Sequence, residues 1–164
     1  MRCILFYHSL VSDWNHGNAH FLRGMVNELL ERGHEVRVYE PEAGWSIRNL
    51  KEEYGIKPII EFHRSFPRLR SIPYRLEIME WDRVLNGADL VLVHEWNDPA
   101  LIGLIGDFRK RDSSFRLLFH DTHHRSVTEP AVMDALDLSG YDGVLAFGGV
   151  IRDRYLKEGW TNRA

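Results

Sequence analysis

The sequence has very little cysteine and no long hydrophobic run. Its 164 residues include one cysteine, Cys3, which lies in a short apolar segment near the start of the chain. A single cysteine excludes a disulfide within the chain and is typical of a reducing compartment. No stretch approaches the roughly 18 apolar residues of a membrane-spanning helix, and the apolar segment after Met1 is too short for a signal peptide. We therefore expect a soluble, cytoplasmic protein with no integral membrane segment.

An excess of charge of one sign is also lacking. The chain has 21 basic and 24 acidic residues, scattered along its length, and a formal net charge of -3. Such a surface has no long-range attraction for nucleic acid, so we expect no nucleic-acid partner. Several catalytic motifs are missing as well: the glycine-rich dinucleotide motif, the P-loop, the GxSxG elbow, the HExxH helix and paired CxxC motifs. These absences disfavour a dinucleotide enzyme, a P-loop NTPase and a serine hydrolase.

Three short apolar runs, however, end abruptly at a histidine. They are residues 4–7 before His8, residues 90–93 before His94, and residues 117–119 before His120. Uninterrupted apolar runs of this length are typical of parallel strands that are buried on both faces. Ligands of open α/β sheets bind outside the carboxyl ends of such strands. The three histidines therefore mark the expected site.

Strand and helix patterns alternate through the chain. We expect five strands, at residues 2–8, 36–39, 89–93, 115–119 and 141–147. Residues 40–73 contain four prolines and are expected to be mostly irregular, with a short strand near residues 58–60. The alternation predicts the α/β class: one domain over residues 1–164, built on a single Rossmann-like, doubly wound parallel sheet with helices on both faces.

Helices are expected between these strands. The first ends at Gly33, and its apolar positions share one face: Phe21, Leu22, Met25, Val26, Leu29 and Leu30. Further helices are expected over residues 74–85, near 130–136 and before Gly159. Another follows Asn97, with an acidic cap at Asp98 and a proline at its first position, and its core positions are Leu101, Ile102, Ile105 and Phe108.

The first candidate site is the loop between the first strand and the first helix. It contains His8 and, at the start of the helix, Asn15, His16, Gly17 and Asn18. Free N–H groups and the helix dipole favour phosphate or carboxylate at such a position. The alternative interpretation is that an asparagine only caps the helix and the glycine only makes the turn.

The second candidate site is the dense polar cluster after the 115–119 strand. It contains His120, Asp121, His123 and His124. Imidazoles near neutrality suit sugar hydroxyls, proton transfer or a metal ion. Zinc or manganese ligation by this HxxH segment is a minor alternative, and we assign no metal site and no cofactor. A structural role for the first two residues, followed by a solvated loop, stays open.

Two further strand exits carry candidate binding residues. His94 and Glu95 follow one strand, and Glu95 is either a base or a group that orients the next loop. Gly148 and Gly149 precede the last helix, where they suit an anion or an ordinary turn.

Four segments resemble GT-B fold glycosyltransferases. Residues 17–36 resemble their first loop, helix and second-strand entry, closed by the pattern LxxRGHxV. Residues 88–94 and 118–121 resemble their strand-and-histidine segments, in particular those of the glycosyltransferase 4-like and spore-maturation-type branches. Residues 141–155 resemble the strand and helix that finish their amino-terminal domain.

The resemblance implies that the chain is the acceptor-side domain of such an enzyme. His120 is then expected beside the reacting sugar, Asp121 is expected to orient His120 or a hydroxyl group, and the other candidate residues are expected to bind substrate or phosphate. The nucleotide-sugar donor is expected to bind a carboxyl-terminal domain or a partner subunit, because no donor domain is present in these residues; the acceptor is unknown. We therefore expect no transfer by this chain alone. Two alternatives remain: a stand-alone, flavodoxin-like module that binds a small anion, and a metal-dependent hydrolase that uses residues 120–124.

Overall fold

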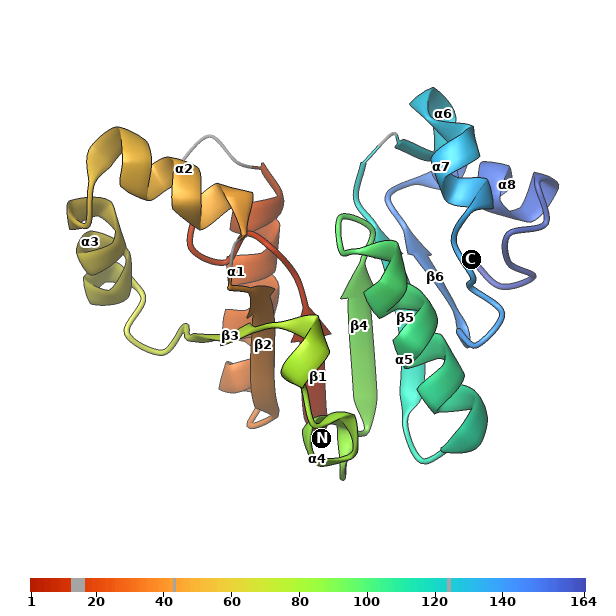
Figure 1. The fold of residues 1–164 in the computed structure, drawn as a ribbon, viewed down its shortest axis with the longest axis horizontal. Coiled ribbons are helices and arrows are strands. Elements are labelled where there is room, and N and C mark those ends of the chain that lie inside the picture. The colour runs from red at the N-terminus through yellow and green to blue at the C-terminus, as the bar shows by residue number, and fades with distance from the viewer. Residues whose placement is uncertain (13–16, 43, 124) are drawn as a thin grey trace. The chain divides into compact units, whose positions relative to one another are not determined.

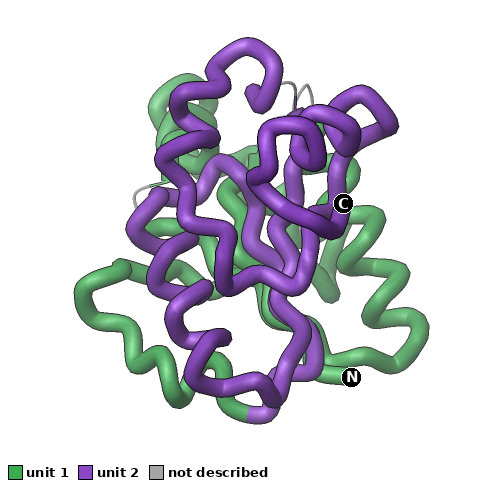
Figure 2. The backbone as a smooth tube through the Cα atoms, turned by 90° about the vertical axis from the view of Figure 1, so that its right-hand side faces the viewer, with its two compact units in different colours: residues 1–86 green, residues 87–164 purple. Residues whose placement is uncertain are grey.

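The computed structural model describes residues 1–12, 17–42, 44–123 and 125–164 (Figure 1). The chain consists of two compact units, Met1–Asn86 and Gly87–Ala164 (Figure 2). Each unit contains three strands with helices around them, and each is described by itself.

In the first unit, three parallel strands lie in the order β3-β2-β1. They are β1 (Arg2–Phe6), β2 (Glu35–Pro41) and β3 (Ser71–Tyr74). Helix α1 (Gly17–Glu31) connects β1 to β2, and Gly33 follows it with a φ of 78°. Glycine adopts this positive φ without a steric penalty, which agrees with the expectation that the helix ends at Gly33.

The buried face of α1 differs from the expected apolar face in the second turn of the helix. Phe21 is exposed, whereas Arg23 is buried together with Leu22 and Val26. The Arg23 guanidinium donates to the carbonyl oxygens of Leu10 and Ser12, both at 2.9 Å. An arginine with backbone acceptors can replace an apolar residue at a buried position, because its hydrogen bonds offset the cost of desolvation. Phe21, which the sequence placed on the apolar face of this helix, therefore lies at the surface.

The expectation of an irregular segment at residues 40–73 was also wrong. The structure has two helices there, α2 (Trp45–Tyr54) and α3 (Lys57–Ser65), followed by β3. Pro58 lies in the first turn of α3, where a backbone N–H would form no hydrogen bond within the helix, so proline is tolerated there. Residues 58–60 are therefore helical, and the expected short strand does not form. Ile59 and Phe62, three residues apart, form the buried side of this helix.

The helix expected over residues 74–85 is shorter than its pattern suggested. Only a 3-10 turn, η1 (Leu76–Ile78), and the short helix α4 (Trp81–Leu85) form. Trp81 of α4 lies at the aromatic cluster of the sheet, in which the Phe6 ring is 5.3 Å from that of Tyr39 and 6.0 Å from that of Trp81. The backbone is extended at Met79, so the expected helix is interrupted between η1 and α4.

The second unit repeats the α/β alternation. Its parallel strands lie in the order β4-β5-β6: β4 (Leu90–His94), β5 (Arg116–Asp121) and β6 (Gly143–Ala146). The helices are α5 (Pro99–Arg111), α6 (Arg125–Thr128), α7 (Pro130–Asp134) and α8 (Gly149–Lys157). Helix α5 begins as expected, since the Asp98 carboxylate accepts a 2.8 Å hydrogen bond from the Ala100 N–H. Its four expected core residues are all buried.

The α/β, Rossmann-like fold class is confirmed. All six strands are parallel to their neighbours within a unit, and helices connect and cover them (Figure 1). Strand β3 is the one that the sequence did not predict. Among the described residues, none of the helices has both the length and the apolar composition that crossing a bilayer requires.

Candidate functional site

The ends of β4 and β5 bring four of the candidate residues together in the second unit. The register pairs His94 with His120, and the centres of their rings are 5.8 Å apart. Glu95 follows directly, and its N–H donates to the carbonyl oxygen of His120 at 3.0 Å. Because parallel strands end at one edge of the sheet, Asp121 lies at the same edge.

Asp121 is a fully buried carboxylate with a partner on each oxygen. Its Oδ2 accepts a 2.9 Å hydrogen bond from the hydroxyl of Tyr155 on α8, and its Oδ1 accepts one of 2.9 Å from the His123 N–H. These contacts hold the start of the following loop against the last helix. The geometry therefore makes Asp121 a positioning residue; direct participation in a reaction stays a prediction.

Glu95 forms a second buried carboxyl group beside Asp121. Its side chain is 1% exposed, and its Oε1 accepts a 3.1 Å hydrogen bond from the Thr122 N–H. Its Oε2 has no hydrogen-bond partner among the described residues. Burial, and then the neighbouring charge of Asp121, raises the pKa of Glu95 to about 8. Glu95 therefore carries a proton at neutral pH, and the two carboxyl groups titrate as a pair.

The two histidines of this cluster are neutral for different reasons. Burial lowers the pKa of His120 to about 4, although the negative charge of Asp121 acts to raise it. His94 is fully buried, and its Nδ1 accepts from the Trp96 N–H at 3.3 Å. The proton of His94 is thus assigned to Nε2, which lies 2.8 Å from the Thr122 hydroxyl. Neutral imidazoles suit hydrogen bonding to hydroxyl groups.

An exposed aromatic surface lies next to the buried cluster. Trp96 is 41% exposed, and its ring centre is 5.8 Å from that of His123. The Arg125 guanidinium lies 4.7 Å from the centre of the Trp96 ring. Such a cation–aromatic contact fixes the indole at the surface. His124 lies outside the described residues.

In the first unit, the strand ends open onto a cavity of about 270 Å³, which we call the strand-end cavity. It is lined by His8, Glu40, Pro41, Glu42, Gly44, Ile47, Lys51, Ser71 and Pro73. His8 is 6% exposed, and its ring packs against that of Trp45 at 6.0 Å. Of the described candidate residues of this unit, His8 is the one that lines the cavity.

Glu40 is a half-buried acid that lines the strand-end cavity. It accepts a 2.6 Å hydrogen bond from the Leu10 N–H. Burial raises its pKa, while hydrogen bonds from the Ser71 side chain and from that N–H lower it. Glu42 and Lys51 are exposed at the rim. Sequence reasoning missed Glu40, Glu42, Lys51 and Ser71 because it treated residues 40–73 as irregular. The acid at the end of the second strand was the available signal.

Of the remaining glycine and loop candidates, those that the structure describes do not line either cavity. Gly17 and Asn18 form the start of α1, and Asn15 and His16 lie outside the described residues. Gly148 has a φ of 94°, which accounts for the glycine before α8. A side chain at Gly149 would meet no atom within 4 Å, so nothing there requires a close backbone approach. Anion binding at these positions stays a prediction.

Comparison with known proteins adds no identity to this geometry. No family model matches the chain, and neither a curated protein nor a solved structure matches it significantly. Within the part of the chain that the structure describes, no group of three or more histidine, cysteine, aspartate or glutamate side chains is placed to hold a metal ion.

Proposed function

We propose that this chain is the acceptor-side part of a nucleotide-sugar-dependent glycosyltransferase of the GT-B type. The observation that carries the proposal is the strand-end cavity, which lies at the carboxyl ends of parallel strands in a Rossmann-like fold and is lined by both polar and apolar side chains. This is the position at which such folds bind ligands. The sequence resemblance of residues 17–36, 88–94, 118–121 and 141–155 adds the reaction class.

The chemistry of the strand-end cavity suits a sugar hydroxyl pattern. Carboxylates such as Glu40 and Glu42 accept hydrogen bonds from neighbouring hydroxyls, and Lys51 donates to them. The cavity volume of about 270 Å³ lies just below the ~300–1,000 Å³ of pockets for drug-sized ligands, a size that favours one sugar unit.

In the second unit, the proposal gives His120 a place beside the reacting sugar and Asp121 the task of orienting it. A neutral His120 accepts or donates a hydrogen bond without adding charge. Transfer also requires groups that position the donor and stabilise the leaving diphosphate. The proposal therefore assigns the donor to a further domain or to a partner subunit, and it expects no transfer by residues 1–164 alone.

Saccharide binding tests this proposal directly. A panel of free mono- and disaccharides, UDP-sugars, GDP-sugars and inorganic phosphate is titrated into the ¹⁵N-labelled chain, and amide shifts are followed by NMR. We expect saturable shifts from at least one saccharide at residues 8, 40–42, 51 and 71, with nucleotide-sugars acting no more strongly than their sugar alone. Shifts there from phosphate alone support the anion-binding module instead and overturn the proposal, as does the absence of saturable saccharide shifts.

Variants at the rim locate the saccharide. We expect Glu42→Gln to weaken binding about threefold or more, because it replaces a charged acceptor with a neutral one. Glu31→Gln makes the same change at an exposed position of α1 and serves as the matched control. Equal affinities of the two variants would place the saccharide elsewhere.

A further inference from the structure

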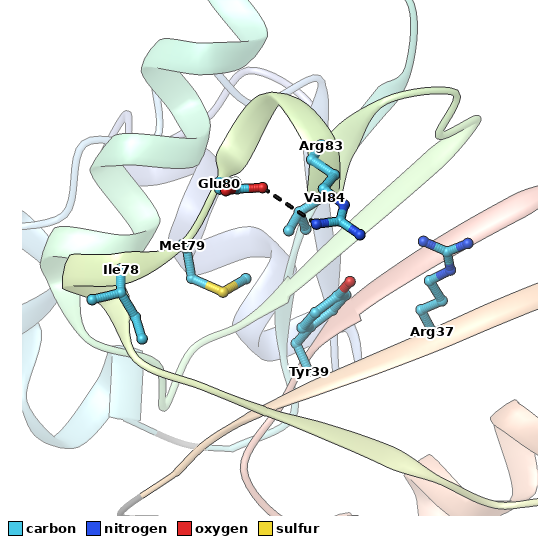
Figure 3. Close-up of a pocket in the computed structure, with 7 residues that line it drawn as sticks. All are labelled: Arg37, Tyr39, Ile78, Met79, Glu80, Arg83 and Val84. Carbon is cyan, nitrogen blue, oxygen red and sulfur yellow. Dashed lines mark hydrogen bonds and ion pairs between the residues drawn. The ribbon is translucent and has the colours of Figure 1, made fainter.

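The first unit has a second cavity, which lies over the middle of β2 and not at its carboxyl end. Its volume is about 360 Å³, and it opens between β2 and the η1–α4 segment. Figure 3 shows its polar side, formed by Arg37, Tyr39 and Arg83, and its apolar side, formed by Ile78, Met79 and Val84. We call it the arginine cavity. Nothing in the proposed transfer uses it.

The polar side of the arginine cavity is held in place by the sheet. Arg37 and Tyr39 are two residues apart on β2, so their side chains leave the same face. The Tyr39 ring stacks on that of Phe6, with centres 5.3 Å apart. In Figure 3 the Tyr39 hydroxyl is directed toward the side on which the guanidinium groups of Arg37 and Arg83 lie. No described residue forms a hydrogen bond with this hydroxyl that would occupy its proton.

The two guanidinium groups keep donors available for a ligand. Arg37 pairs with Glu35 at 2.7 Å, and Arg83 pairs with Glu80 at 3.5 Å. The Arg83 and Glu80 side chains are 85% and 72% exposed, so this long ion pair contributes little. Each guanidinium carries five N–H donors, and its planar fork matches the oxygens of a carboxylate or phosphate. The lining itself contains two cations and the single carboxylate of Glu80, while Glu35, which pairs with Arg37 from outside the lining, offsets part of this positive charge.

The apolar side adds a second requirement on the ligand. Ile78 is 64% exposed although it lies at the cavity wall, and Met79 and Val84 are half-buried beside it. Covering such side chains with an apolar group removes their surface from water and favours binding by about 25 cal/mol per Å². A fully hydrated inorganic ion leaves this surface uncovered.

We propose that the arginine cavity binds a small organic anion. Its phosphate or carboxylate group contacts the polar side, and a short apolar part packs on the apolar side. The two guanidiniums and the tyrosine hydroxyl recognise the anion, whereas the apolar wall selects an organic ligand over inorganic phosphate. The inference is independent of saccharide binding at the strand-end cavity, because the two cavities share no lining residue.

Four ligands of graded chemistry test this inference on the ¹⁵N-labelled chain: hexyl phosphate, hexanoate, inorganic phosphate and hexanol. We expect one or both organic anions to give saturable amide shifts at residues 37, 39 and 78–84, and the stronger of the two identifies the anionic group. Inorganic phosphate and hexanol are expected to bind at least about tenfold more weakly, because phosphate lacks the apolar part and hexanol lacks the anionic group. The proposal fails if neither anion saturates at these residues, or if hexanol binds as tightly as they do.

Variants assign the contacts within the arginine cavity. Arg83→Gln is expected to weaken binding of the anion about tenfold, whereas Arg32→Gln, which removes an exposed arginine directly after α1 that pairs with Glu28, leaves binding unchanged. Tyr39→Phe keeps the stacked ring and removes only the hydroxyl, so a smaller loss is expected with an unchanged spectrum elsewhere. Equal affinities of Arg83→Gln and Arg32→Gln overturn the proposal.

Discussion

The polar residues at the strand ends of the two units contrast in their access to solvent. In the second unit, Glu95 and Asp121 are almost completely buried, and Tyr155 and backbone N–H groups bind them. In the first unit, Glu42 and Lys51 stand exposed at the rim of the strand-end cavity. The same sequence pattern, an apolar run that ends in a histidine, therefore leads to a closed cluster in one unit and to an open cavity in the other.

The elements that follow each strand explain this difference. In the second unit, α8 supplies Tyr155, a large side chain that is fully buried against the carboxylate of Asp121. In the first unit, the chain after β2 turns into α2, which presents Ile47 and Lys51 to the cavity. A strand end thus predicts where polar groups gather. The next helix decides whether a ligand reaches them.

The largest expected effect is the loss of the Asp121 carboxylate. Asp121→Ala leaves the Tyr155 hydroxyl and the His123 N–H without their acceptor in a buried place. Unsatisfied buried donors cost ~1–3 kcal/mol each, so we expect the free energy of unfolding to fall by about 3 kcal/mol. Urea unfolding followed by circular dichroism measures this change.

Asp153→Ala is the matched control for this variant. Asp153 lies on α8 with 66% of its side chain exposed, and it pairs with Arg152 at the surface. We expect a change within about 0.5 kcal/mol, as for other exposed positions. If the two variants lost similar amounts of the free energy of unfolding, Asp121 would contribute no more to stability than an exposed aspartate does.

The second expected effect is a fall in stability above pH 6.5 that depends on Glu95. Its pKa is raised from 4.5 to about 8 in the folded chain. The stabilising contribution of the protonated form is therefore complete below pH 4.5 and is lost as the pH rises through about 8. His120, with its pKa lowered from 6.5 to about 4, acts in the opposite sense, and its contribution is lost as the pH falls below 6.5. Between pH 6.5 and 8 the effect of Glu95 is the larger of the two, because above pH 6.5 His120 is mostly neutral in both the folded and the unfolded chain.

Linkage sets the size of this effect. Over that range one such group lowers the free energy of unfolding by about 1.5 kcal/mol. Glu95→Gln retains the shape of the neutral acid without a titrating proton, so its stability is expected to change less between pH 6.5 and 8. The measurement is urea unfolding of both proteins at pH 6.5, 7.25 and 8. Parallel curves would mean that Glu95 is ionised throughout and that the cluster is more solvated than its burial indicates.

The contrast also shows what the sequence could predict. The apolar runs before His94 and His120 located β4 and β5, and parallel pairing then placed both histidines at one sheet edge. The cap at Asp98 and the core of α5 were readable because they depend on neighbours within a few residues. Tyr155 was not identified, since its partner Asp121 is 34 residues earlier and no local pattern connects them.

Residues 40–73 show the opposite case, in which composition was misleading. Four prolines suggested an irregular segment, but Pro58 lies in the first turn of α3, where a proline is tolerated. The strand-end cavity is lined partly by this segment, through Ile47 and Lys51 of α2 and Ser71 and Pro73 of β3. The open site was therefore missed for the same reason as the helices beside it.

The smallest expected effect belongs to the rim of the strand-end cavity. Glu42 pairs with Arg75 at 3.3 Å, and both side chains are about 60% exposed. Exposed ion pairs contribute ~0–1 kcal/mol, so Glu42→Gln is expected to change the free energy of unfolding by less than about 0.5 kcal/mol. Lys51→Gln is expected to behave in the same way, because Lys51 is exposed too. If either variant loses more than about 1.5 kcal/mol in urea unfolding, the rim is part of the packed structure. The polar residues at the strand ends would then stabilise the fold in both units, although they differ in burial. The proposal of a ligand in the strand-end cavity would lose its physical basis.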